Sequence, residues 1–136
     1  MLHGYRAGRC FYCGEPIGAG DGHVDHVIPR QLLMHDEPWN LVLAHGFCNA
    51  QKSDALVGDT YIEALVDRNE HLIASNHPLK RHIVAQLGAT PGQRRRAVLG
   101  TYGDAKLVIP YTWGGLRGVV PRTDPFYEAV MRSLER

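Results

Sequence analysis

Two short motifs containing cysteine constrain this chain more than any other feature of its sequence. Cys10 and Cys13 form one pair and His45 and Cys48 form another, and each pair has a two-residue spacer. This spacing lets a tight turn present both side chains of a pair to one tetrahedral ion. Three thiolates and one imidazole suit zinc, and four protein ligands close the coordination sphere. The sequence therefore predicts a structural zinc site.

One Cys-x-x-Cys pair alone would more often be a redox motif or a coincidence. No βαβ pattern of the thioredoxin type follows the first pair, and three cysteines are too few and too odd in number for a disulfide framework. Residues 1–58 also hold few large apolar side chains, so burial alone would stabilise them poorly. A bound metal ion would supply the missing stability.

The chain of 136 residues fits one domain, or one domain with a helical extension. Apolar residues make up 44% and charged residues 21%, and no apolar run is long enough to span a membrane. The first nine residues hold no apolar segment of the kind found in secretory signals. These features predict a soluble, cytoplasmic protein without a membrane anchor.

The order of the expected elements predicts an α+β fold with two parts. Residues 1–58 contain two expected strands, 23–28 and 41–44, which form a hairpin with a long connection, and an expected helix at 47–56. From Asp59 onward, apolar residues recur at helical spacing, and Thr60 with Glu63 suggests a capping box. Further expected elements are helices 59–77, 79–87 and 91–99, a strand at 106–109, a loop at 111–122 and a helix from Asp124. We expect a core at 1–58 and a helical extension at 59–136 packed on it.

Polar residues in three places accompany the metal motifs. Asp25-His26 precedes Pro29-Arg30, Asn40 follows a tryptophan at the start of the second strand, and Asn49 and Lys52 follow the last cysteine. In order and spacing, residues 10–54 resemble the HNH nucleases, whose ββα-metal fold carries Asp-His, Asn and a final His or Asn. His45 departs from the cysteine common at this zinc position in the family, an exchange that zinc tolerates.

The resemblance implies a role for each of these residues. His26 would be the general base, Asp25 and Asn49 would bind a catalytic divalent cation, and Asn40 would hold the His26 loop. Arg30 and Lys52 would position the phosphate. Asn40 could instead be a plain turn residue, and Lys52 a solvated charge on a helix.

The chemistry of the residue types agrees with these roles. Phosphodiester hydrolysis needs a base for water and a hard cation for the developing charge. An imidazole such as His26 titrates near neutral pH, and the oxygens of Asp25 and Asn49 suit Mg²⁺ or Mn²⁺. Neighbouring residues of a strand point to opposite faces, so a bulge or a strand end must reorient Asp25 or His26.

The positive charge of the chain lies toward its C-terminal end, where residues 90–136 hold eight Lys or Arg and four Asp or Glu. Arg94, Arg95 and Arg96 could bind nucleic acid, with Arg117 and Arg122, or they could form a solvated helix face. The same tail, residues 90–136, could instead contact a protein partner.

These observations predict a metal-dependent endonuclease that hydrolyses DNA. Two alternatives stay open. The first is a zinc-containing module that binds nucleic acid or protein without catalysis, although such a module would be expected to have lost at least one catalytic residue. The second is an RNase of the same fold, which would share every catalytic residue.

Overall fold

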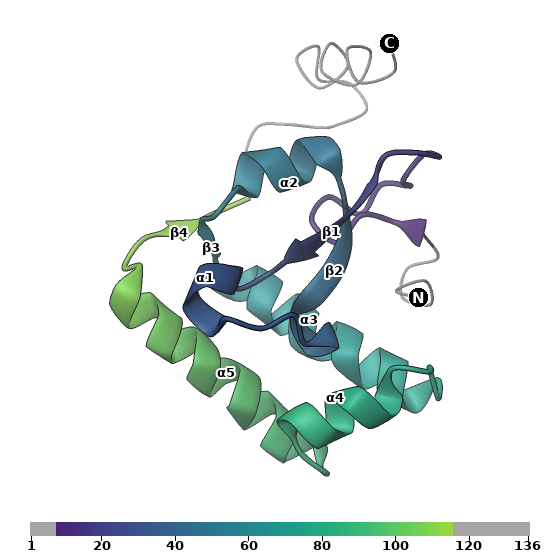
Figure 1. Cartoon of the computed structure of the whole chain (residues 1–136), viewed down its shortest axis with the longest axis vertical. Helices are drawn as coiled ribbons and strands as arrows, with labels where there is room; N and C mark the ends of the chain where they lie inside the picture. Colours follow the sequence, from purple (N-terminus) through teal and green to yellow (C-terminus); the bar gives the residue numbers. More distant parts are fainter. Residues whose placement is uncertain (1–7, 116–136) are drawn as a thin grey trace.

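An antiparallel pair of strands, β1 (Gly22–His26) and β2 (Leu41–His45), carries most of the predicted site residues (Figure 1). The structure is a computed structural model that describes residues 8–115. The register pairs Gly22 with His45 at one end of the ladder and His26 with Leu41 at the other. The two histidines therefore lie at opposite ends of the same ladder.

The connection between the two strands contains α1 (Arg30–Leu33) and a 3-10 turn, η2 (Pro38–Asn40). The predicted hairpin with a long connection is confirmed, but β1 ends at His26 and not at Ile28. The ladder stops there because the backbone N–H groups of Val27 and Ile28 donate to Asn40. We expected either a bulge or a strand end at Asp25 and His26. The register has no bulge, and β1 ends at His26.

The described part of the chain after residue 58 contains three helices: α3 (Asp59–Ala74), α4 (Lys80–Leu87) and α5 (Pro91–Val108). They pack against one another, and both α3 and α4 contact η2. Figure 1 shows α4 and α5 below the strand pair and the short helix α2 (Gly46–Lys52) above it. A second, parallel pair joins β3 (Leu56–Val57) to β4 (Thr112–Trp113).

One cluster of buried apolar side chains joins the two parts of the chain. It includes Phe11, Trp39 and Phe47 from the first part and Leu65 and Ile83 from the helices. The helices thus cover the weakly apolar first part. The predicted α+β class with a helical C-terminal part is confirmed, whereas the boundary at residue 58 stays a prediction.

The helix expected at 47–56 is wrong at its C-terminal end. Helix α2 ends at Lys52, and Ser53 has a positive φ of 50° that interrupts the helical path. Leu56 then lies in β3. Apolar periodicity could not separate these elements because the strand has only two residues.

The capping box at Thr60 and Glu63 is also wrong. Helix α3 begins at Asp59, so Thr60 lies inside the helix and Gly58 is the N-cap, with no side-chain capping bond. The Glu63 carboxylate instead binds Arg95. A capping box does occur at α5, where the Thr90 side chain accepts from the Gln93 amide.

The end of the third long helix and the following strand were predicted wrongly. Helix α5 passes through Gly100 and Gly103 and continues to Val108, so residues 106–108 are helical and form no strand. A glycine within a helix costs about 1 kcal/mol, which tertiary packing can offset. Here Val98, Tyr102 and Ala105 are buried along one face of α5. The expected loop at 111–122 contains β4; its residues from 116 on, with Arg117 and Arg122, and the helix from Asp124 lie outside the described residues.

Candidate functional site

The two cysteine motifs meet at the Gly22–His45 end of the ladder. One ligand atom from each of the four side chains lies within 4.8 Å of all the others. The His45 Nδ1 atom is 3.3 Å from the Cys13 sulfur and 3.8 Å from the Cys48 sulfur. A tetrahedral zinc ion requires N to S separations of about 3.6 Å. The predicted cluster of Cys10, Cys13, His45 and Cys48 is confirmed, and its donor set fits zinc.

Local hydrogen bonds hold the first pair in a tight turn. The Gly14 N–H donates to the Cys10 carbonyl at 2.9 Å, and Gly14 has a positive φ of 79°, which favours glycine. The His45 Nε2 atom lies 2.9 Å from the Pro16 carbonyl oxygen. If Nε2 donates this bond, Nδ1 is left as the metal-binding nitrogen, facing the thiols.

The thiols of the cluster influence one another strongly. The hydrogen bond with Cys13 lowers the pKa of the Cys10 thiol, whereas the hydrogen bond with Cys10 raises the pKa of Cys48. Because the sulfur atoms lie this close, negative charge on one thiol disfavours charge on the next, and several thiolates together need a cation. A divalent metal ion supplies that cation, because thiolates are the form that binds metal.

At the opposite end of the ladder, Asp25 is buried and its carboxylate is held from two sides. The Tyr12 hydroxyl donates to the Asp25 Oδ2 atom, and the Lys52 Nζ atom lies 3.4 Å from the same oxygen. Burial raises the pKa of Tyr12, so its hydroxyl stays protonated as a donor. Both contacts are to Oδ2, which leaves Oδ1 as the oxygen that could bind a cation.

His26 is held at its backbone and at its ring. Its carbonyl accepts a 2.9 Å hydrogen bond from Lys52, and its Nε2 atom lies 2.7 Å from the Asp36 Oδ1 atom. The side chain is 26% exposed, so the imidazole can meet solvent. Asp36 also accepts a 2.8 Å bond from Arg30 Nε. These bonds lower the pKa of Asp36, with the His26 bond as the largest cause.

Asp36 is a site residue that sequence reasoning missed. It lies in the connection between α1 and η2 and is 60% exposed, so its position does not come from burial. A single carboxylate in a polar loop gave no signal of its own. The only hint in the sequence was its place between the Asp25-His26 and Asn40 motifs.

Asn40 is fully buried and binds the segment that follows His26. Its side-chain oxygen accepts from the Ile28 N–H at 2.9 Å, and its side-chain nitrogen donates to the Ile28 carbonyl at 2.8 Å. Its backbone carbonyl accepts from Val27 at 3.0 Å. These three contacts are those of a residue that holds the His26 loop.

The structure places Lys52 differently from the sequence prediction. The side chain is 1% exposed, and its ammonium group donates to the carbonyls of His26 and Ser53. Burial lowers the pKa of Lys52, and the nearby Asp25 carboxylate partly offsets this effect. Lys52 is therefore neither a solvated helix charge nor an exposed cation that faces a phosphate. It fixes Asp25 and His26 relative to α2.

Arg30 reaches the His26 end of the ladder through Asp36, and Asn49 lies on α2, which packs on β1. Asn49 is half-buried on α2, one turn before Lys52, and residues three apart share a face of a helix. Arg30 opens α1, with a half-exposed side chain that binds Asp36. The structure thus gathers Asp25, His26, Arg30, Asn40 and Asn49 on neighbouring elements.

The three consecutive arginines have different environments. Arg94 is buried and binds both carboxylate oxygens of Glu70, at 2.7 and 2.8 Å. Arg95 is exposed and binds Glu63, and Arg96 is also exposed. Arg94 therefore joins α5 to α3, and its burial and its bonds to Glu70 leave it unable to contact a phosphate. Arg95 and Arg96 can differ from it because consecutive residues of a helix point in different directions.

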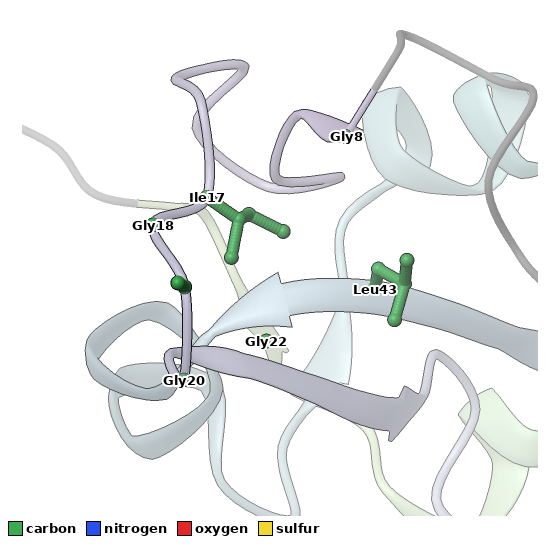
Figure 2. Close-up of a pocket in the computed structure, with 7 residues that line it drawn as sticks. Gly8, Ile17, Gly18, Gly20, Gly22 and Leu43 are labelled. Carbon is green, nitrogen blue, oxygen red and sulfur yellow. The ribbon is translucent and has the colours of Figure 1, made fainter.

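A separate pocket of about 490 Å³ lies beside the start of β1 (Figure 2). Its lining is mostly glycine, with Ile17, Ala19 and Leu43 as the apolar side chains. The pocket contains none of the residues proposed for catalysis. A lining of this kind offers no polar side chain for chemistry.

One comparison with known proteins, the scan against family models, found a match. Residues 10–57 match the model of a family described as HNH endonuclease. This stretch, which holds both cysteine pairs and the Asp25-His26 motif, therefore carries the HNH sequence pattern and indicates nuclease function. No curated protein matches the chain. Among the residues that the structure describes, no helix has the length and apolar character needed to cross a bilayer.

Proposed function

We propose that this protein is a metal-dependent endonuclease that hydrolyses DNA phosphodiester bonds. The observation that carries the proposal is the His26 end of the β1–β2 ladder. There, a part-exposed imidazole lies beside the residue that offers a buried carboxylate, and both are fixed through Lys52. The HNH pattern across the same residues supports this function.

In the proposed reaction, His26 accepts a proton from the attacking water. Asp25 and Asn49 offer hard oxygen atoms to Mg²⁺ or Mn²⁺, which would supply charge stabilisation for the phosphate when bound. Arg30 binds a phosphate oxygen. Asn40 holds the loop after His26 through Ile28. Zinc at the cysteine cluster would keep the first part folded.

The non-catalytic alternative is less well supported by the structure. A binding module would not require a buried carboxylate held by both a tyrosine and a lysine, nor an imidazole held by a carboxylate. An RNase of the same fold would use the same residues. Substrate preference therefore has to be measured.

Purified protein should be incubated with Mg²⁺ and either plasmid, linear duplex, single-stranded DNA or RNA. We expect cleavage of DNA, and the His26→Ala variant should be slower by at least about a hundredfold, the usual effect of a positioned base. Binding and fold should change little in that variant. Undiminished cleavage by His26→Ala would remove His26 from the mechanism, and cleavage of RNA alone would replace the proposed substrate.

A further inference from the structure

Helix α3 lies beyond the HNH match, yet it carries two polar residues that are almost fully buried. Arg68 is 3% exposed and Asn69 is 1% exposed. Burial of a cation is costly unless hydrogen bonds compensate it. The position of these two residues within the core therefore needs a reason beyond helix packing, which Leu65 and Leu72 already provide.

The Arg68 guanidinium spreads over the backbone of η2 and β2. It donates to the carbonyl oxygens of Leu41 at 2.6 Å, Pro38 at 3.0 Å and Trp39 at 3.1 Å. Asn69 adds a 3.0 Å bond from Nδ2 to the Trp39 carbonyl. The Asn69 side-chain oxygen accepts from Arg68 Nε at 3.0 Å, which fixes the two side chains to each other.

The carbonyls that Arg68 and Asn69 bind lie on both sides of Asn40. The backbone at Asn40 is thereby held before and after the residue, and its side chain is aimed at Ile28. Asn40 in turn fixes Val27 and Ile28, which directly follow His26. Hydrogen bonds on either side of the backbone at residues 38–41 thus link α3 to the segment that directly follows β1.

We propose that Arg68 is a positioning residue for the catalytic loop, acting through Asn40, with Asn69 as its support. Helix α3 is then part of the catalytic unit. The inference rests on the proposed nuclease function for its catalytic consequence, whereas its structural part can be tested alone. A planar guanidinium suits this role because it donates in several fixed directions, which a lysine ammonium on a flexible stem cannot reproduce.

The test compares Arg68→Lys with Arg94→Lys. Arg94 is also a buried arginine on a long helix, but it binds Glu70 and Gly88, away from Asn40. Hydrogen exchange of the Ile28 amide, which donates to Asn40, reports on the loop directly. The Phe11 amide, which donates to the Leu43 carbonyl, serves as the internal reference.

In Arg68→Lys, exchange at Ile28 should accelerate at least about tenfold relative to Phe11, since lost bonds to a charged group loosen the loop locally. In Arg94→Lys, both amides should change by the same factor. Below the unfolding temperature, Arg68→Lys should also lower kcat for DNA cleavage about tenfold and leave KM within about twofold. Arg94→Lys should leave kcat unchanged.

Equal acceleration of both amides in Arg68→Lys, or a kcat equal to that of the wild type, would overturn the inference. If the Ile28 amide responds but the wild type cleaves no nucleic acid, the nuclease proposal fails and the positioning of the loop stands. Should Arg68→Lys not fold, Asn69→Ala is measured in its place. That variant removes the bond to the Trp39 carbonyl and the bond that Asn69 accepts from Arg68. The same changes at Ile28 and in kcat then support the inference, and their absence overturns it.

Discussion

Each end of the β1–β2 ladder places a histidine among other polar side chains, but the two ends differ in their donor atoms and in how far the protein encloses the site. At the Gly22–His45 end, four ligand atoms from the protein surround one point, and three of the four side chains are buried. At the His26–Leu41 end, the imidazole is part-exposed, and the buried Asp25 carboxylate is held by Tyr12 and Lys52 through one of its two oxygens. Closed sites hold a metal for structure, whereas open sites leave room for water and substrate.

Under the proposed function, this difference would let one short segment hold two metals with different tasks. Soft sulfur donors and one imidazole gather where the turn at Gly14 brings them together. Hard oxygen donors lie where the strand ends and Lys52 and Asn40 fix the backbone. Tyr12 connects the two ends, because it lies between Cys10 and Cys13 and donates to Asp25.

The largest expected effect concerns the closed end. The Cys48→Ala variant should lose its bound zinc and the folded state of the first part, because structural zinc provides on the order of 10 kcal/mol of folding free energy in small domains. Metal analysis of the wild type should give one zinc per chain. Circular dichroism of the variant then tests the consequence, and a variant that stays fully folded would contradict the structural role.

At the open end, we expect Asp36→Asn to slow DNA cleavage by about tenfold, since a charged partner that orients an active-site ring contributes this much. Asp104→Asn, a change of an exposed carboxylate on α5, is the matched control and should have no effect. Steady-state cleavage rates decide the point. Faster cleavage or tighter DNA binding by Asp36→Asn would mean that Asp36 competes with a phosphate for Arg30.

A substitution of Arg94 tests whether this arginine stabilises the fold through Glu70 or binds nucleic acid. Arg94→Gln should lower the free energy of unfolding by about 2 kcal/mol, because it leaves the part-buried Glu70 carboxylate without its cation. Denaturant titration measures this effect. An unchanged stability together with weaker DNA binding would return Arg94 to the nucleic-acid surface predicted from the sequence.

The smallest expected effect is that of the two exposed arginines. If Arg95 and Arg96 contact phosphates, replacing both with Gln should reduce the salt slope of log K by about two units, with all DNA sequences weakened alike. Arg95 must give up its bond to Glu63 to do so. Fluorescence anisotropy across a salt titration measures the slope, and an unchanged slope would identify a solvated helix face.

The closed end could be predicted from the sequence because its information is local. Two pairs with short spacers specify a metal cluster whatever the rest of the fold does. The strand pair was also predictable, since Pro29 and the turn residues bound its apolar runs. The family pattern then predicted Asp25, His26 and Asn40 as site residues, and their catalytic roles stay predictions.

The environment of each side chain could not be predicted in the same way. Lys52 was expected at the surface, but it is buried because α2 packs on β1, a contact that joins residues 26 positions apart. The bonds from Arg68 span 27 to 30 positions, and those from Arg94 to Glu70 span 24. Helix α5 continues through Gly100 and Gly103 for a similar reason. The packing of its buried face outweighs the low helix propensity of glycine.

The most direct test of the account separates the two ends by their metals. Zinc content and DNA cleavage should be followed together while Mg²⁺ is removed by dialysis into Mg²⁺-free buffer and then restored. We expect cleavage in the wild type to stop and return with Mg²⁺ while one zinc per chain stays bound, and we expect no return in His26→Ala. Cleavage that follows zinc content instead of Mg²⁺, or that returns in His26→Ala, would contradict the division between a closed structural end and an open catalytic end.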